Sequence, residues 1–194
     1  MKTKNPRLII VAEANGSGKT TFAVPYTKEL GFQFLNADEI TKKLEEKGES
    51  NALMKAGRIF FATLHQCLIN KENFVVETTL SGSYINKVAR KAKQQGYLVQ
   101  IIYIFLDNPD LCIDRVKSRV LKGGHHVPTE DIIRRYYRSK TNFWNNFTNL
   151  ANDWKLFYNG EEGFQQVAIG KNKKYSIENQ ILFNLFHVNV NERS

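Results

Sequence analysis

The 194-residue chain predicts an α/β fold in which helices cover both faces of a mostly parallel sheet. Two observations lead to this fold class. Strand-like and helix-like segments alternate along the chain, and the first strand-like run is continuously apolar, as in a strand buried on both faces. A third observation concerns domain organisation: we find no linker, internal repeat or low-complexity tract, so we expect a single domain over residues 1–194.

Local sequence signals predict each strand and each helix of this alternating pattern. β-branched and aromatic residues predict strands at residues 7–12, 32–36, 74–77 and 97–106, the last being the longest and expected to be central. Two further strands, 154–159 and 164–169, are expected around a GEEG turn. Apolar periodicity, Pro109 as a start signal and glycines as stop signals predict helices at 19–30, 38–47, 51–71, 83–95 and 109–121. Thr129 is a plausible N-cap for a helix through residue 136 and toward 150, and Ser176 for a terminal helix.

A glycine-rich loop follows the first strand. The stretch VAEANGSGKTT (residues 11–21) matches the phosphate-binding pattern G-x-x-x-x-G-K-[ST] except at its first position. Its glycines let backbone N–H groups turn toward phosphate oxygens, and the following helix adds positive charge. We therefore expect ATP to bind at Asn15, Gly16, Ser17, Gly18, Lys19, Thr20 and Thr21, with Thr20 coordinating Mg²⁺. This loop makes the predicted fold a P-loop NTPase-type three-layer sandwich.

Glu13 occupies the position of the first glycine in the pattern. Glu13 stands where the chain leaves the strand. We therefore expect its side chain to disfavour the backbone conformation there, and we do not expect the replacement of glycine to remove a phosphate ligand. A carboxylate this close to phosphates is unfavourable unless it points away or pairs with a base. The alternative is a structural strand, turn and helix that matches the pattern by chance.

Polar side chains also follow the second and third strands. Asp38, in FLNADEI, can accept a proton from an acceptor hydroxyl or hold a water bound to Mg²⁺. Its alternative role is to cap the helix that starts at Glu39. Glu77 and Thr78 end the third strand and suit hydrogen bonding to a polyhydroxy substrate, unless they only hold a turn. Ligands of open α/β sheets bind at this carboxyl edge, so all three are candidate site residues.

Arginines gather between Arg115 and Arg138, where phosphoryl transfer needs guanidinium groups. Arg115 and Arg119 are one helical turn apart, and Arg134 and Arg138 repeat this spacing after a GGHHVP turn. We expect residues 109–150 to form a helical lid that brings some of these arginines to the phosphates. The alternative, a solvated basic face, must hold for some of them because neighbouring arginines on a helix point in different directions.

The cysteines and histidines indicate neither a disulfide framework nor a metal centre. Cys67 and Cys112 lie in apolar helix-like runs typical of reduced, buried thiols. His125 and His126 have no carboxylate or thiol at ligand spacing, so we expect them to contact phosphate or solvent. The apolar run 8–12 is too short for a signal peptide, and no run is long enough to span a bilayer. A cytoplasmic location without a membrane partner is expected.

The order of four motifs, NGSGKTT, FLNADEI, ETTLSG and the arginine-bearing lid, resembles the zeta-toxin-like P-loop kinases over roughly residues 7–145. Members of that family phosphorylate a hydroxyl of UDP-N-acetylglucosamine. The resemblance implies Asp38 as the base, Glu77 and Thr78 as acceptor ligands and Arg119 as the first lid arginine. Arg134 or Arg135 supplies the second, because the HHVP turn has histidines where family members often carry arginine.

These observations favour an ATP-dependent kinase that phosphorylates a hydroxyl of a small molecule, for example a nucleotide sugar. The chain is shorter than many toxins and contains no recognisable antitoxin-binding segment, so both a toxin and a housekeeping kinase fit. The net charge of +9, with Trp144 and Trp154 near the lid, supports a nucleic-acid-directed kinase or ATPase less strongly. Glu13 supports a third alternative, a nucleotide-binding switch without transferase activity.

Overall fold

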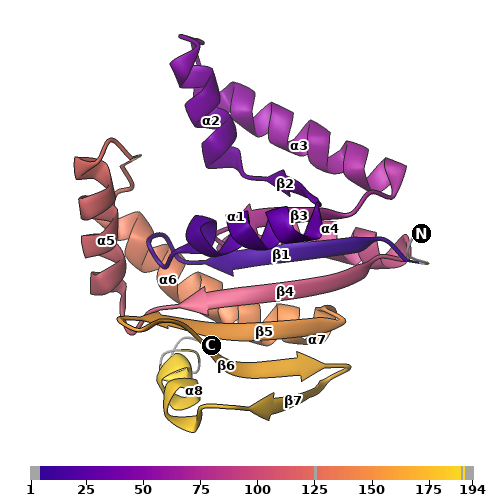
Figure 1. Ribbon diagram of the computed structural model, residues 1–194, viewed down its shortest axis with the longest axis vertical. Coiled ribbons are helices and arrows are strands. Elements are labelled where there is room, and N and C mark those ends of the chain that lie inside the picture. Colours follow the sequence, from indigo (N-terminus) through magenta and orange to yellow (C-terminus); the bar gives the residue numbers. More distant parts are fainter. Residues whose placement is uncertain (1–4, 125, 189, 191–194) are drawn as a thin grey trace.

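A seven-stranded sheet runs through the protein in the order β2-β3-β1-β4-β5-β6-β7 (Figure 1). The structure is a computed structural model that describes residues 5–124, 126–188 and 190. Strands β1 to β5 are parallel, and β6 and β7 extend the sheet antiparallel beyond β5. The strands are β1 (Arg7–Glu13), β2 (Gln33–Leu35), β3 (Phe74–Thr78), β4 (Leu98–Phe105), β5 (Asp153–Gly160), β6 (Gly163–Lys171) and β7 (Lys174–Ile177).

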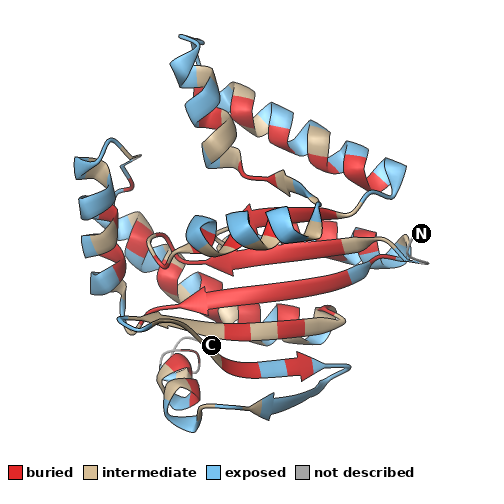
Figure 2. Cartoon of the chain, in the orientation of Figure 1, coloured by how far each residue is buried: buried red, intermediate tan, exposed pale blue. Residues whose placement is uncertain are grey.

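Helices cover both faces of this sheet, which confirms the three-layer α/β sandwich. The helices are α1 (Lys19–Leu30), α2 (Ala37–Glu46), α3 (Ala52–Asn70), α4 (Tyr84–Gln94), α5 (Pro109–Leu121), α6 (Thr129–Asn142), α7 (Thr148–Leu150) and α8 (Gln180–His187). A π-helical segment, η1 (Phe143–Phe147), joins α6 to α7. Ile9 and Val11 of β1 pack on the face that α1 covers, whereas Ile10 packs on the opposite face with α4 and α8. Figure 2 shows the resulting burial of β1 and β4 over most of their length.

The elements expected up to residue 121 are all present, with ends shifted by at most one residue. Strand β4 is the middle strand of the sheet, as its length and apolar character predicted. The hairpin around the GEEG turn is also present, as β5 and β6. Local apolar patterns and glycine or proline signals therefore sufficed for this part of the chain.

Two expected helix starts are wrong. Ser176 does not cap the last helix, because it lies in β7 and pairs with Ile169 of β6. The helix begins at Gln180, and the Asn179 side chain accepts the N–H of Leu182 at 3.0 Å. Thr129 is the first residue of α6, and its N-cap is Pro128. The segment around Ser176 pairs with the open edge of β6 and so joins the sheet. Local sequence signals do not predict this pairing.

Helix α6 packs directly on the sheet, although it falls within the segment expected as a lid. Tyr103 of β4 and Ser139 share a hydrogen bond of 2.6 Å, and Tyr136 donates to the carbonyl oxygen of Leu106 at 2.9 Å. Lys140 is also buried here, against the rings of Tyr136 and Phe186, and its Nζ has no hydrogen-bond partner among the described residues. Burial lowers the pKa of Lys140 from 10.5 to about 8.

We expect Lys140→Met to raise the free energy of unfolding at pH 7 by roughly 1 to 2 kcal/mol, because methionine fills similar space without a charge to desolvate. The folded protein releases the Lys140 proton at lower pH than the unfolded chain does. The free energy of unfolding of the wild type therefore rises as pH rises from about 8 to 10.5. The gap between variant and wild type should therefore narrow over that range. Urea unfolding at pH 7, 8.5 and 10 measures the difference in free energy of unfolding between Lys140→Met and the wild type. Lys91→Met, at an exposed position, is the control. A difference that does not narrow with rising pH contradicts this prediction.

Candidate functional site

A cleft of about 770 Å³ lies beside the glycine-rich loop, between α2 and α5. In Figure 1, α5 stands next to the ends at which β1 and β4 stop, which is the carboxyl edge of the parallel strands. Basic side chains in its lining are Lys42, Arg115, Arg119 and Lys122, and acidic ones are Asp38, Glu39 and Glu45. Thr20 and His126 also line it, whereas His125 lies outside the described residues. The cleft therefore brings basic side chains near Asp38, the candidate base.

The loop needs glycine at two positions for steric as well as conformational reasons. Gly16 and Gly18 have φ angles of 94° and 99°, in the left-handed region that other residues rarely adopt. A Cβ on Gly16 would lie 2.7 Å from the carbonyl oxygen of Cys112, and one on Gly18 would lie 2.6 Å from Nδ2 of Asn159. The loop is thus pressed between α5 and the end of β5.

Glu13 pairs with the lysine of the loop. Its Oε2 accepts the backbone N–H of Lys19 at 2.7 Å, and its Oε1 accepts Nζ of Lys19 at 2.7 Å. Burial raises the pKa of Glu13 to about 7, against the opposing effect of Lys19. Burial alone would lower the pKa of Lys19, but Glu13 and Glu77 together raise it above its usual value. Of the two arrangements considered from the sequence, pairing with a base is the one observed.

Thr20 and Glu77 meet at the start of α1. The hydroxyl of Thr20 lies 3.1 Å from each carboxylate oxygen of Glu77, and Nζ of Lys19 lies 4.0 Å from Oε1 of Glu77. Burial raises the pKa of Glu77, opposed by Lys19 and by the hydrogen bond from Thr20. Hydroxyl and carboxylate oxygens are the hard ligands that Mg²⁺ prefers, so this pair fits the ion. Within the described residues, no group of three His, Cys, Asp or Glu side chains forms a closed metal site.

Asp38 lies where two cavities adjoin. It is exposed and lines both the large cleft and a second pocket of about 300 Å³, whose polar residues include Glu77, Thr78 and Thr79. Asp38 does not cap α2, because Asn36 does: its Oδ1 accepts the N–H groups of Asp38 at 2.8 Å and Glu39 at 3.2 Å. The capping alternative is therefore wrong, and the Asp38 carboxylate is available to the cavities.

The second pocket has an aromatic wall that the sequence did not reveal. Phe60 and Phe61 of α3 and Tyr84 of α4 line it, and the rings of Phe61 and Tyr84 are 4.6 Å apart. The sequence predicted only a helix over residues 51–71 for this stretch. The tertiary structure brings these rings from α3 and α4 to Glu77, Thr78 and Thr79 at the end of β3. A pocket with one aromatic and one polar side suits a ring-shaped molecule with hydroxyl groups.

The structure separates the arginines into two groups. Arg115 and Arg119 line the large cleft, as their helical spacing predicted. Arg135 reaches the loop, where its Nη1 donates to Oδ1 of Asn15 at 3.2 Å. Both Arg134 and Arg135 bond Asp131, at 2.6 and 3.4 Å, but Arg134 lines a separate hollow with Arg138. Of the two adjacent arginines, Arg135 is therefore the one that the structure brings to the loop.

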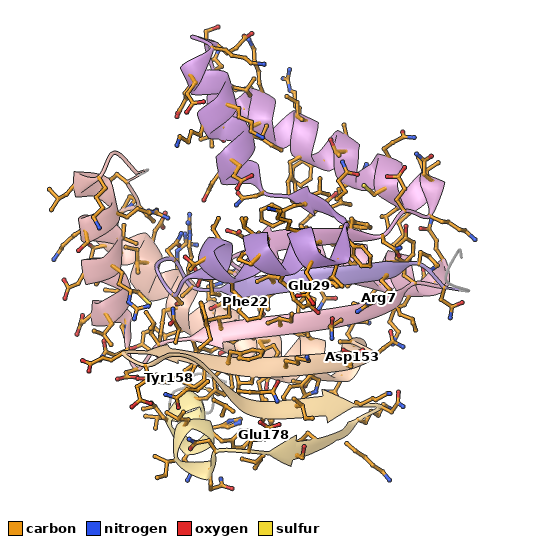
Figure 3. The ribbon with its side chains drawn as sticks, in the orientation of Figure 1. Arg7, Phe22, Glu29, Asp153, Tyr158 and Glu178 are labelled. Atoms are coloured by element: carbon orange, nitrogen blue, oxygen red, sulfur yellow. The ribbon has the colours of Figure 1, made fainter. Side chains whose placement is uncertain are left out.

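Asn159, near the end of β5, is a site residue that sequence reasoning missed. Its Nδ2 donates to the carbonyl oxygen of Ser17 at 2.7 Å, and its own carbonyl oxygen accepts Nη2 of Arg115 at 3.1 Å. The hairpin is held against α1 by Phe22, whose ring lies 5.2 Å from that of Phe157. Figure 3 labels Phe22 on α1 and Tyr158, the neighbour of Asn159 on β5. Asn159 thus connects the loop to a cleft arginine.

The fold and the loop define a protein of the P-loop NTPase type with a kinase-like architecture. The chain belongs to the family described as AAA domain (AAA_33), whose sequence model matches residues 8–142. An uncharacterized protein of Haemophilus influenzae is 29% identical over 131 residues, which are 68% of this chain and 92% of that protein.

In the residues that the structure describes, no helix is long and apolar enough to cross a membrane.

Solved structures that share the fold include the following two. A chain of the PezAT chromosomal toxin-antitoxin system of Streptococcus pneumoniae is 18% identical, with a TM-score of 0.66 over 97% of this chain and 81% of that chain. A chain of the AvrRxo1-ORF1:-ORF2 structure with ATP is 20% identical, with a TM-score of 0.68 over 93% of this chain and 63% of that chain. This protein therefore spans less than two thirds of the second relative. Together with the family match, these structures confirm the resemblance to zeta-toxin-like P-loop kinases.

We expect Asn159→Ala to weaken ATP binding roughly three- to tenfold and to lower the melting temperature by about 2 to 4 °C, because one hydrogen bond that fixes the loop is lost. Titration calorimetry and thermal melts measure the two effects. Asn145→Ala, which removes an exposed asparagine of η1, is the matched control and should change neither quantity. Wild-type ATP affinity in Asn159→Ala would show that the loop holds its shape without this contact.

Proposed function

We propose that this protein is an ATP-dependent kinase that transfers the γ-phosphoryl group to a hydroxyl of a small molecule. The observation that carries the proposal is the place of Asp38, on the wall shared by the basic cleft and the aromatic pocket. A phosphate chain held by the glycine-rich loop would extend into the cleft, and an acceptor in the pocket would present its hydroxyl to the same carboxylate. The proposal thus places donor, acceptor and base together, as in-line transfer requires.

In the proposed reaction, the acceptor oxygen attacks the γ-phosphorus and the bond from phosphorus to the ADP oxygen breaks. Asp38 takes the proton of the hydroxyl, and Arg115, Arg119 and Arg135 stabilise the negative charge on the transferring group. Thr20 would hold Mg²⁺, which neutralises phosphate charge when bound. The role of Arg134 is the weakest of the expected ones, because it points to another surface.

For the acceptor, we propose a hydroxylated ring compound, with a nucleotide sugar such as UDP-N-acetylglucosamine as the first candidate. The rings of Phe61 and Tyr84 would stack on the sugar or base, and Glu77 and Thr78 would bind hydroxyl groups. The basic side chains of the adjoining cleft would meet the diphosphate. A screen of hydroxylated metabolites and nucleotide sugars with labelled ATP identifies the acceptor, with single-stranded oligonucleotides included for the nucleic-acid alternative.

We also propose that the protein acts in the cytoplasm and has a protein partner that controls it. Support for the partner comes from the two related structures, one from a toxin-antitoxin system and the other containing ORF1 and ORF2 chains. Purification of the tagged protein with the products of its neighbouring genes tests for such a partner.

We expect Asp38→Asn to lower turnover by roughly two to four orders of magnitude while ATP affinity barely changes, because asparagine keeps the shape but cannot accept the proton. Turnover on the identified acceptor and calorimetric ATP binding measure both quantities across a magnesium titration. A defect that added Mg²⁺ partly relieves would assign Asp38 to metal binding instead. Lys19→Ala, with its folding checked by thermal melt, serves as the control that abolishes transfer through the loop.

Unchanged turnover in Asp38→Asn would refute the catalytic role of this residue. ATP binding by the wild-type protein without transfer to any acceptor would support the nucleotide-binding switch. Phosphorylation of oligonucleotides in preference to small molecules would favour the nucleic-acid-directed kinase.

A further inference from the structure

Glu13 occupies the anion-binding centre of the loop. The backbone N–H of Lys19 opens α1, where the helix terminus carries partial positive charge, and Nζ of Lys19 is the cation of the loop. Both donate to the Glu13 carboxylate at 2.7 Å. The side chain of Glu13 is 3% exposed and that of Lys19 is 10% exposed, so solvent does not replace these bonds readily. In a phosphate-binding loop, the same two groups are donors to phosphate oxygens.

A phosphate chain and the Glu13 carboxylate cannot share this place. The N–H of Lys19 has one hydrogen, which already makes a short, well-formed bond to Oε2. Two anions at hydrogen-bonding distance of the same lysine would also repel each other strongly in a buried site. A bound nucleotide therefore has to take the place of the carboxylate.

We propose that Glu13 is an internal competitor of the nucleotide phosphates, which holds Lys19 in the ligand-free protein and opposes retention of the diphosphate product. The inference rests on the proposed kinase function. While ATP is bound, Glu13 is displaced from Lys19 at a cost that contacts to the phosphates must exceed. After transfer, the contacts to the γ-phosphoryl group are gone, and the return of Glu13 to Lys19 favours release of ADP. Glu13 is thus a residue that tunes nucleotide affinity, and it takes no proton in the transfer itself.

The arrangement explains why a carboxylate in place of a motif glycine is compatible with a folded loop. Without a partner, Lys19 would be a buried cation in the ligand-free protein, which is costly. Glu77 is too far to replace Glu13 fully, because its Oε1 lies 4.0 Å from Nζ and both its oxygens lie 3.1 Å from the Thr20 hydroxyl. Glu13 supplies the counter-charge that a phosphate supplies in the bound state.

The direct test is ADP binding, measured by titration calorimetry, to wild type, Glu13→Gln and Glu13→Gly. We expect both variants to bind ADP roughly tenfold or more tightly, since a charge-assisted hydrogen bond no longer competes. Glutamine keeps the size of the side chain without the charge, and glycine restores the residue of the motif. Glu29→Gln removes an exposed carboxylate of α1, the helix that begins at Lys19; it is the matched control and should bind ADP as the wild type does. Thermal melts confirm that each variant is folded.

The pH dependence of ADP binding supplies a second readout. The titratable groups that act on Glu13 or are acted on by it are Lys19 of α1, Glu77 of β3, Tyr103 of β4 and Cys112 of α5. Burial outweighs Lys19 and raises the pKa of Glu13 to about 7. A phosphate nearby raises it further, so binding takes up a proton and affinity falls as pH rises above about 7. In Glu13→Gln, the decrease in ADP affinity that is due to Glu13 should be absent. The decrease or increase that is due to titration of ADP itself should remain in both proteins.

The outcomes separate this inference from the proposed function. Equal or weaker ADP affinity in folded Glu13→Gln and Glu13→Gly, beside measurable wild-type binding, overturns the competitor role and leaves the kinase proposal standing. ADP and ATP binding in the variants but not in the wild type supports the competitor role in its strongest form. Absence of binding in all of them overturns both.

Discussion

The parallel pairing of β1 with β3 is the constraint on which the site depends. Its register sets Val11 beside Glu77 and Ala12 beside Thr78, so both strands end at the same edge. Glu77 therefore reaches the first turn of α1, where it meets Thr20. Because β4 flanks β1 on the other side, this edge is buried, and a charge there needs a partner. The lysine of the loop accordingly lies between two carboxylates.

This concentration of charge gives the site its character. Glu13 and Glu77 keep Lys19 protonated despite its burial, while burial in turn moves the pKa of each carboxyl upward. A phosphate chain entering the loop would add negative charge to a centre in which two carboxylates already lie beside one lysine. Nucleotide binding would therefore have to rearrange the ion pairs of Lys19. Glu13, at the first position of the loop motif, is the residue placed to move.

The remaining parts of the site come from segments far apart in the chain. Arg135 on α6 reaches Asn15 of the loop, and Asn159 on β5 joins Ser17 to Arg115 of α5. These contacts fix the loop from two sides through groups that lie outside its own motif. Helix α6 itself is anchored in the core, so α5 and the turn after it form the part of the expected lid that faces the cleft.

The sequence by itself determined the alternation of strands and helices, the three-layer fold, the loop, and the placement of Asp38, Glu77 and Arg119 near one edge. These features follow from local periodicity and from the rule that parallel strands end together. Only the tertiary structure decided that Glu13 pairs with Lys19, that Arg135 rather than Arg134 meets the loop, and that Asn159 and Phe61 join the site. Side-chain direction, helix rotation and pairing at a sheet edge depend on packing between distant segments, which no local pattern encodes. For the same reason Ser176 was expected to cap a helix and lies in a strand.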